Sequence, residues 1–150
     1  MRVKVQAEDF DVGAELKALM GETPGAGAAV TFTGYVRGED ARGGISALEL
    51  EHYPAMTEKK LAVIAADAGR RFRLQNALIV HRVGRLSPGD RIVLVAAVAA
   101  HREDAFEAAK FLMDYLKTEA PFWKKESYAG GKRWVEAKGT DDAKKARWEK

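Results

Sequence analysis

The chain has 150 residues, with 25 Lys or Arg against 22 Asp or Glu, and its formal net charge is +3. This length predicts one domain with a buried core, and so small a charge indicates a local anion site rather than a surface that coats nucleic acid. The sequence has no cysteine, which excludes disulfides, thiolate nucleophiles and zinc–thiolate sites. If the protein handles sulfur, the sulfur must therefore arrive on another molecule.

The first half of the chain alternates strand and helix patterns. In chain order these are a strand at 3–6, a helix at 11–21, a strand at 28–37, a mobile loop at 38–44, a strand at 45–53 and a helix at 57–72. We expect Asp11 and Thr57 to cap the two helices, because their side-chain oxygens can accept from the first helical N–H groups. Alternation in the third strand places Leu48, Leu50 and His52 on its buried face, where we interpret the histidine as a satisfied core residue.

The second half of the chain has strands on either side of one long helix. In chain order these are a strand at 77–84, a Pro–Gly turn at 86–90, an apolar strand at 91–100, a helix at 101–120 and two strands at 122–129 and 132–137 joined by a Gly–Gly hairpin turn. The helix has an apolar stripe that includes Phe106 and Leu112, and Pro121 disfavours helical geometry in the residue before it. The polar tail is expected to fray, although Trp148 could dock.

This order of elements predicts an α+β fold with a mostly antiparallel sheet and packed helices. We expect a single domain over residues 1–138, followed by a polar C-terminal tail, residues 139–150. The longest apolar run, residues 92–100, is far shorter than the roughly 20 residues of a membrane span, and the N-terminus lacks the apolar core of a signal peptide. These features predict a soluble, cytoplasmic protein.

The segment MDYLKTEAPFWKKE places lysines beside a proline and two large aromatic residues. Asp114 could pair with Lys117, and a cation also suits the C-terminal end of a helix, which would explain a lone lysine. However, the helix end, the proline and the next strand could fold Lys124 back toward Lys117. Two ammonium groups in one pocket repel each other and favour an anionic ligand, and either could act as an acid or base. Phe122 and Trp123 would supply an apolar wall for a planar heterocycle.

Other candidate residues lie near the ends of strands or within them. His101 and Arg102 stand at the start of the long helix, where N–H groups and the helix dipole attract anions, although solvation of the helix end is the favoured explanation of this feature alone. Arg37 ends a strand just before the glycine-rich loop. His81 and Arg82 lie in mid-strand, where neighbouring side chains point to opposite faces, and we interpret that pair as structural.

Five stretches occur in order between residues 28 and 138. They are VTFTGYVR, LELEHYPAMTEKKL, VHRVGRLSPGD, AAHREDAFEAAKFLMDYLKTEAPFWKKE and RWVEAK. Together they resemble the large, catalytic subunit of molybdopterin synthase. The resemblance implies a sulfurtransferase that converts cyclic pyranopterin monophosphate (precursor Z) to molybdopterin. The dithiolene sulfurs would come from the C-terminal thiocarboxylate of a small ubiquitin-like subunit that ends in Gly-Gly.

The resemblance also implies an assembly, a fold and a set of site residues. Two large subunits would form a homodimer, with a small subunit at each end to complete a heterotetramer, and the fold would be an α/β hammerhead with an additional antiparallel β subdomain. No metal and no cofactor are expected besides the pterin substrate. Lys117, as acid/base or covalent anchor, and Lys124 would be catalytic. The residues expected to bind substrate are Tyr35, Val36, Arg37, His101, Arg102, Lys117, Lys124, Lys125, Glu126 and Lys138.

Two of these assignments need a further explanation. His101 and Arg102 would reach the pocket of the other protomer. Family members use a basic residue at the position of Lys138, and a lysine cannot copy the bidentate phosphate contact of an arginine. Two other functions stay open: a basic nucleic-acid or polyanion-binding module without catalysis, and an inactive scaffold that only holds the small subunit. Against the nucleic-acid module, the sequence lacks the glycine–aromatic signature of RNA-recognition strands.

Overall fold

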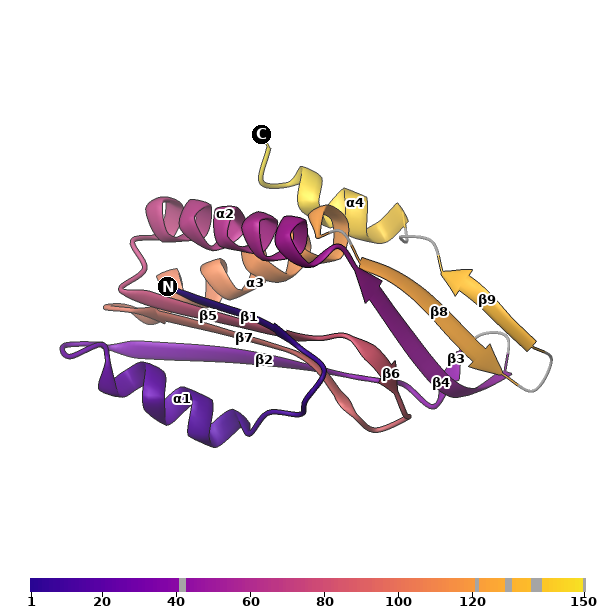
Figure 1. The fold of residues 1–150 in the computed structure, drawn as a ribbon. Coiled ribbons are helices and arrows are strands. Elements are labelled where there is room, and N and C mark those ends of the chain that lie inside the picture. The colour runs from indigo at the N-terminus through magenta and orange to yellow at the C-terminus, as the bar shows by residue number, and fades with distance from the viewer. Residues whose placement is uncertain (41–42, 121, 129–130, 136–138, 150) are drawn as a thin grey trace.

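The computed structural model describes residues 1–40, 43–120, 122–128, 131–135 and 139–149, and it contains two sheets with helices packed around them (Figure 1). The strands are β1 (Arg2–Gln6), β2 (Ala28–Tyr35), β3 (Glu39–Asp40), β4 (Gly43–His52), β5 (Asn76–Arg82), β6 (Gly84–Leu86), β7 (Arg91–Ala99), β8 (Phe122–Tyr128) and β9 (Gly131–Val135). The helices are α1 (Val12–Gly21), α2 (Pro54–Phe72), α3 (Arg102–Glu119) and α4 (Gly139–Ala146). Within the described residues, none of these helices is long and apolar enough to cross a bilayer.

The first sheet has the strand order β1-β5-β7-β2. β1 pairs with β5 in parallel, whereas the β5–β7 and β7–β2 pairs are antiparallel. β7 lies inside the sheet, and its residues from Val93 to Ala99 are all buried. Its unbroken apolar run follows from this position, because a strand that is covered on both faces needs apolar side chains on both.

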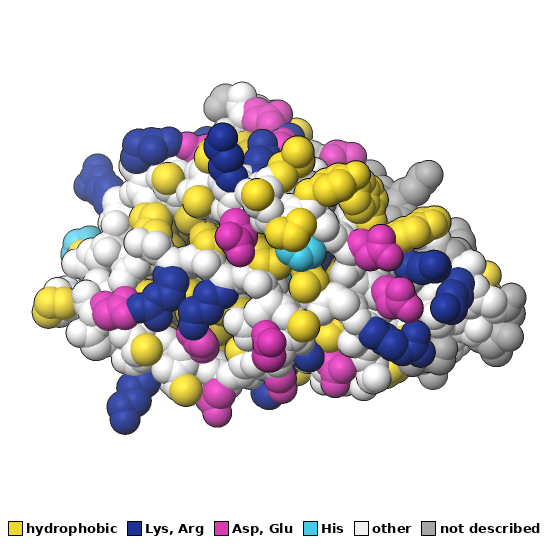
Figure 2. Space-filling view, in the orientation of Figure 1, with side chains coloured by type: hydrophobic (Ala, Val, Ile, Leu, Met, Phe, Trp, Pro, Cys, Tyr) yellow, Lys and Arg dark blue, Asp and Glu magenta, His cyan; other side chains and the backbone are white. Residues whose placement is uncertain are grey.

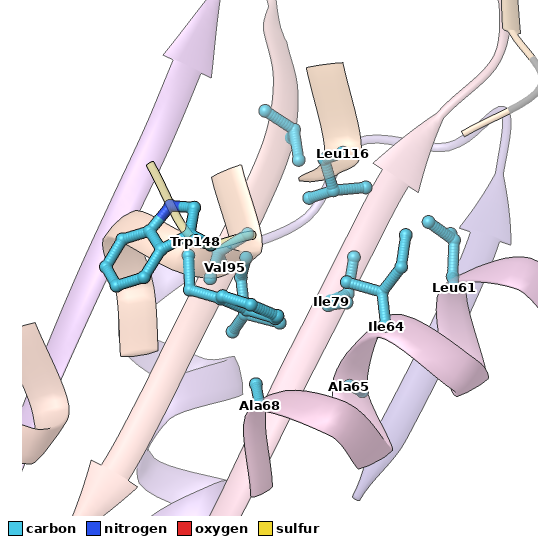
Figure 3. Packing of buried hydrophobic residues seen from close by; sticks show 11 residues of the cluster. Leu61, Ile64, Ala65, Ala68, Ile79, Val95, Leu116 and Trp148 are labelled. Carbon is cyan, nitrogen blue, oxygen red and sulfur yellow. The ribbon is translucent and has the colours of Figure 1, made fainter. Parts of the chain in front are cut away.

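Helices cover both faces of this sheet (Figure 1). On one face, α2 and α3 enclose a buried cluster that includes Leu61, Ile79 and Val95 (Figure 3). On the other face, Leu19 of α1 belongs to a second cluster with Leu78. Successive strand residues point to opposite faces, so neighbouring residues of β5 serve two separate layers of core.

A second sheet, of order β3-β4-β8-β9 with β6 also paired to β4, projects from one end of the first (Figure 1). Its described pairings are all antiparallel. Leu48 and Leu50 pack with Val36 and Leu86 in a small core of their own, as the alternation of β4 predicted. The prediction of an α+β fold with a mostly antiparallel sheet and an additional antiparallel unit is confirmed.

The predicted helix caps are correct for α1 and wrong for α2. Asp11 caps α1, with its Oδ1 accepting a hydrogen bond from the N–H of Ala14 at 2.8 Å. Helix α2 begins at Pro54, three residues before the predicted cap, because a proline ring presets the helical φ of a first residue. Thr57 is therefore buried within the helix, and its Oγ1 has no hydrogen-bond partner among the described residues.

Three smaller predictions are also corrected. Phe106 is 60% exposed, so it lies outside the buried stripe of α3. His52 is only partly buried, and its Nδ1 has no hydrogen-bond partner in the part of the chain that the structure describes, so it is not a satisfied core histidine. The expected mobile loop contains a short hairpin, in which Glu39–Asp40 pair with Gly43–Gly44, while residues 41–42 lie outside the described ranges.

The described part of the C-terminal tail forms α4 and packs on α3 instead of fraying. Trp148 is 9% exposed, and its Nε1 donates a hydrogen bond to Oδ2 of Asp114 at 2.7 Å. Its ring meets Phe72 and Phe111 in edge-to-face contacts, with ring centroids 5.6 and 5.5 Å apart. The expected docking of Trp148 is confirmed, and the indole closes one end of the core between α2 and α3 (Figure 3).

Candidate active site

A pocket of about 400 Å³ opens where the two sheets meet the C-terminal end of α3. Its lining residues come from β2, the segment after it, β5, β7, α3, the end of that helix and β8. They are Phe32, Thr33, Gly34, Tyr35, Arg37, His81, Ile92, Val93, Met113, Leu116, Lys117, Ala120, Phe122 and Lys124. The volume lies in the range typical of sites for small-molecule ligands.

Three of the predicted cationic residues meet at this pocket, namely Arg37, Lys117 and Lys124. Arg37 follows the end of β2, and Lys117 lies in the last turn of α3. The helix ends at Ala120, whose backbone is extended, and β8 then runs back along β4 and brings Lys124 to the same cavity. Three positive side chains in one concave site favour an anionic ligand.

Lys117 is not held by the carboxylate that its sequence spacing suggested. Asp114 accepts the hydrogen bond from Trp148, and its Oδ2 lies 3.6 Å from Nε of Arg147. The C-terminal tail thus supplies the partners of this carboxylate. Within the described residues, Lys117 has no ion-pair partner, so its ammonium can serve a ligand in the pocket.

The two adjacent aromatic residues of β8 face opposite sides of the second sheet, which corrects the expectation that both form one wall. Phe122 lines the pocket together with Phe32 and Tyr35. Trp123 is exposed on the other face and contacts Tyr53 edge to face, with centroids 4.7 Å apart. The reason is the two-residue repeat of a strand, which turns Phe122 and Lys124 toward the cavity and Trp123 away from it.

His81 also lines the pocket, although its position beside Arg82 in mid-strand suggested a structural role. The sequence did contain an indication of this position. Neighbouring side chains of a strand point to opposite faces, so His81 can reach a cavity that Arg82 does not reach. His81 is 8% exposed, and its ring stacks on Phe122 with centroids 3.8 Å apart. Burial lowers the pKa of His81 to about 3, and the charges of Lys124 and Lys117 act in the same direction. The imidazole is therefore neutral at physiological pH.

Three other predicted substrate-binding residues, Val36, Lys125 and Glu126, do not belong to the lining of this cavity. Val36 is buried in the small core of the second sheet, and its backbone N–H and C=O bond to the turn before β7. Lys125 lies on the opposite face of β8, with its Nζ 5.2 Å from the ring centre of Trp134. Glu126 follows Lys124 at a spacing of two, on the same face of the strand. Lys138 lies outside the described residues.

His101 and Arg102 lie at the far end of α3 from the pocket of their own chain. His101 is the N-cap of the helix and Arg102 its first residue, and both are exposed. Arg102 is about 22 Å from Lys117 along the helix axis, at 1.5 Å per residue. Neither residue belongs to the lining of the cavity. They could contribute to catalysis only at the pocket of a second copy, as the family resemblance implies.

In the described part of the chain, no group of three or more His, Cys, Asp or Glu residues gathers that could hold a metal ion. The Arg and Lys side chains of the pocket favour phosphate or carboxylate groups, and its aromatic faces favour a planar ring. The fold and this pocket define an α+β protein with a pocket whose lining favours a small, planar, anionic molecule.

The chain belongs to the MoaE protein family, whose model matches residues 5–119. It is 56% identical to the molybdopterin synthase catalytic subunit of Cereibacter sphaeroides, over 99% of this chain and 100% of that relative. The solved structure of the molybdopterin biosynthesis MoaE protein from Burkholderia ambifaria is 56% identical, with a TM-score of 0.85 over 99% of this chain and 98% of that one. The fold also matches a chain of the complex of subunits 1 and 2 of molybdopterin-converting factor from Helicobacter pylori, with a TM-score of 0.74 at 23% identity over 89% of this chain and 90% of that one.

Proposed function

We propose that this chain is the catalytic subunit of a molybdopterin synthase and acts as a sulfurtransferase on cyclic pyranopterin monophosphate. The observation that carries the proposal is that Arg37, Lys117 and Lys124 converge on one pocket beside Phe122. The substrate joins a phosphate to a planar pterin, and the pocket offers cations for the first and an aromatic face for the second. Membership of the MoaE family supports the same substrate.

The sulfur must reach this pocket on a second molecule, because the chain has no cysteine. We assign delivery to a small ubiquitin-like subunit, whose extended Gly-Gly tail enters the pocket and ends in a thiocarboxylate. Each tail carries one sulfur, so two deliveries complete one dithiolene. Negative charge develops on the acyl oxygen during transfer, and the ammonium groups of Lys117 and Lys124 stabilise it.

Lys117 is the residue to which we assign the central chemical role. Lys117 lines the pocket and has no ion-pair partner among the described residues, so its ammonium can move a proton, or, after losing that proton, its amine can hold an intermediate covalently. Mass spectrometry of the protein during turnover separates the two roles. A covalent anchor gives a substrate-sized mass increase on the peptide that contains Lys117, whereas a proton-transfer residue gives none.

The experiment that tests the function combines the protein with precursor Z and a thiocarboxylated small subunit, and detects the dithiolene product by mass spectrometry. Lys117→Ala should abolish product while the fold is kept. Lys110→Ala is the matched control, since Lys110 is an exposed lysine on the same helix and lies outside the pocket lining. Full activity of Lys117→Ala would refute the assignment.

We also propose a homodimer in which His101 and Arg102 complete the pocket of the partner protomer. His101→Ala should weaken precursor binding in titration calorimetry more than it lowers the free energy of unfolding. At a precursor concentration too low to fill the weakened His101→Ala pocket, mixing Lys117→Ala and His101→Ala chains should restore about a quarter of the activity, because half of randomly formed dimers are mixed and each holds one intact pocket. Mixtures that stay inactive after subunit exchange would refute the shared site.

The nucleic-acid module is the weaker candidate on the observed distribution of charge. On the face drawn in Figure 2, Lys and Arg side chains are interspersed with Asp and Glu rather than gathered in a stripe. The cations that do converge line a concave pocket instead of a groove that could follow a phosphate backbone. A salt-dependent shift with single-stranded RNA at micromolar protein would support the module, and flat binding curves would exclude it.

A further inference from the structure

The charged side chains of the pocket are all hydrogen-bond donors, whereas His81 can offer an acceptor beside them. Arg37, Lys117 and Lys124 carry only N–H groups. These side chains can bind a phosphate, but they cannot accept a hydrogen bond from the N–H groups that a pterin presents along its edge. A site that orients such a heterocycle needs an acceptor at a fixed place.

The structure sets the tautomer of His81. Its Nδ1 lies 2.8 Å from the carbonyl oxygen of Arg82. A carbonyl oxygen only accepts, so Nδ1 must carry the proton and donate it. The imidazole is neutral, since burial and the two neighbouring lysines keep its pKa at about 3. A neutral ring with its proton on Nδ1 has a lone pair on Nε2.

That lone pair is available to a ligand. Among the described residues, the buried side-chain nitrogen and oxygen atoms without a hydrogen-bond partner are Nδ1 of His52 and Oγ1 of Thr57. Nε2 of His81 makes no hydrogen bond in the described structure and is not one of these buried atoms, so it is open to the pocket that the residue lines. Stacking on Phe122 and the bond to the backbone fix the ring from two sides.

We propose that Nε2 of His81 accepts a hydrogen bond from an N–H group of the pterin, and so determines how the heterocycle is oriented while the cations hold its phosphate. This assignment rests on the proposed function and adds a substrate-contacting residue to the same site. The two ends of the substrate are then recognised by opposite chemistry. The lone pair on Nε2 repels phosphate oxygens, which directs the phosphate to Arg37 and the lysines rather than to the imidazole.

Three substitutions separate the acceptor from the rest of the side chain. His81→Asn keeps a donor near the Nδ1 position for the Arg82 carbonyl and lacks the ε acceptor. His81→Phe keeps a ring that can stack on Phe122 and also lacks the acceptor. His81→Gln places an amide oxygen near the position of Nε2 and should recover binding. Because the first two variants have different structural defects, a loss that they share reports the missing acceptor.

The test measures the Kd of precursor Z by titration calorimetry, with inorganic phosphate as a second probe that competes at the cationic side. We expect the Asn and Phe variants to bind precursor Z about tenfold more weakly, the usual effect of one unmade hydrogen bond. Their affinity for phosphate should not change, and the Gln variant should bind precursor Z within about threefold of the unaltered protein. Thermal unfolding of each variant verifies that it is folded.

Each other outcome overturns the assignment in a recognisable way. If the unaltered protein makes dithiolene and the Asn and Phe variants bind precursor Z as it does, His81 has no role in binding and the proposed function stands. If precursor Z and phosphate are weakened equally, the residue only maintains the shape of the pocket. If the unaltered protein neither binds precursor Z nor forms product, the proposed function fails together with this inference.

Discussion

Replacing Trp148 by phenylalanine would remove one buried hydrogen bond and keep most of the ring that α2 and α3 enclose. The indole Nε1 lies 2.7 Å from Oδ2 of Asp114, and both side chains are buried. Edge-to-face contacts with Phe72 and Phe111 can persist in the variant, because a phenyl ring can take the same place. The variant therefore isolates the effect of the hydrogen bond on the docking of the tail.

The expected decrease in the free energy of unfolding depends on the charge of the hydrogen-bond acceptor, the carboxylate of Asp114. A hydrogen bond to a charged group contributes about 1.5–3 kcal/mol to the free energy of unfolding. Arg147, 3.6 Å from the same carboxylate, stays as a second partner, so we expect the lower end of that range. A loss of about 1.5 kcal/mol corresponds to a fall in Tm of roughly 3–6 °C in a domain of this size. Trp148→Ala also removes the buried ring and should cost about 3–5 kcal/mol.

Urea denaturation, followed by circular dichroism, measures these losses. The matched control is Trp134→Phe, because Trp134 is 54% exposed on β9 and the substitution should change the free energy of unfolding by less than about 0.5 kcal/mol. The m-value should stay constant, so that a shift of the midpoint reports stability alone. Equal midpoints for the Trp148 and Trp134 variants would refute the docking of the tail through Asp114.

Three further predictions concern backbone space and pH. Gly27→Ala should lower the free energy of unfolding by about 1–3 kcal/mol, because the added Cβ would lie 1.9 Å from a backbone carbonyl oxygen. The control is Gly21→Ala, which has open space around it and should not lower the free energy of unfolding in the same urea assay. Folding lowers the pKa of His81 from its ordinary 6.5 to about 3, so the unfolded state takes up a proton at a higher pH than the folded state does. The free energy of unfolding should therefore fall as the pH drops from 6.5 to 3. His81→Gln should make the free energy of unfolding less dependent on pH in this range. The hydrogen bond from Arg91 lowers the pKa of Asp9 from 3.8 to about 2, so its stabilising effect is present above pH 3.8 and lost as pH falls through 2. Asp9→Asn should differ from the unaltered protein at pH 5, and most of that difference should be gone near pH 2; a constant difference across that range would contradict the reasoning.

Much of the fold could be predicted from the sequence, because local patterns depend on neighbours along the chain. The apolar run of β7 predicted a strand covered on both faces, and Pro121 marked the end of α3. The motifs between residues 28 and 138 are long enough to indicate the family without the tertiary structure. Strand alternation in β8 could also have separated Phe122 from Trp123, since it states which side chains share a face.

Such local patterns do not show which other element packs against a given face of a strand or helix. Arg37 lines the same pocket as Lys117 only because the two sheets meet beside the end of α3. His81 likewise lines that pocket at the place where Phe122, the first residue of β8, stacks on its ring. The same holds for Asp114, whose carboxylate binds the distant tail instead of the lysine one turn away. The sequence by itself determined most of the helices and strands and the family of this protein, whereas α4 formed where a frayed tail was expected. The tertiary structure alone decided which charged and polar groups share one pocket, because that depends on packing between segments far apart in the chain.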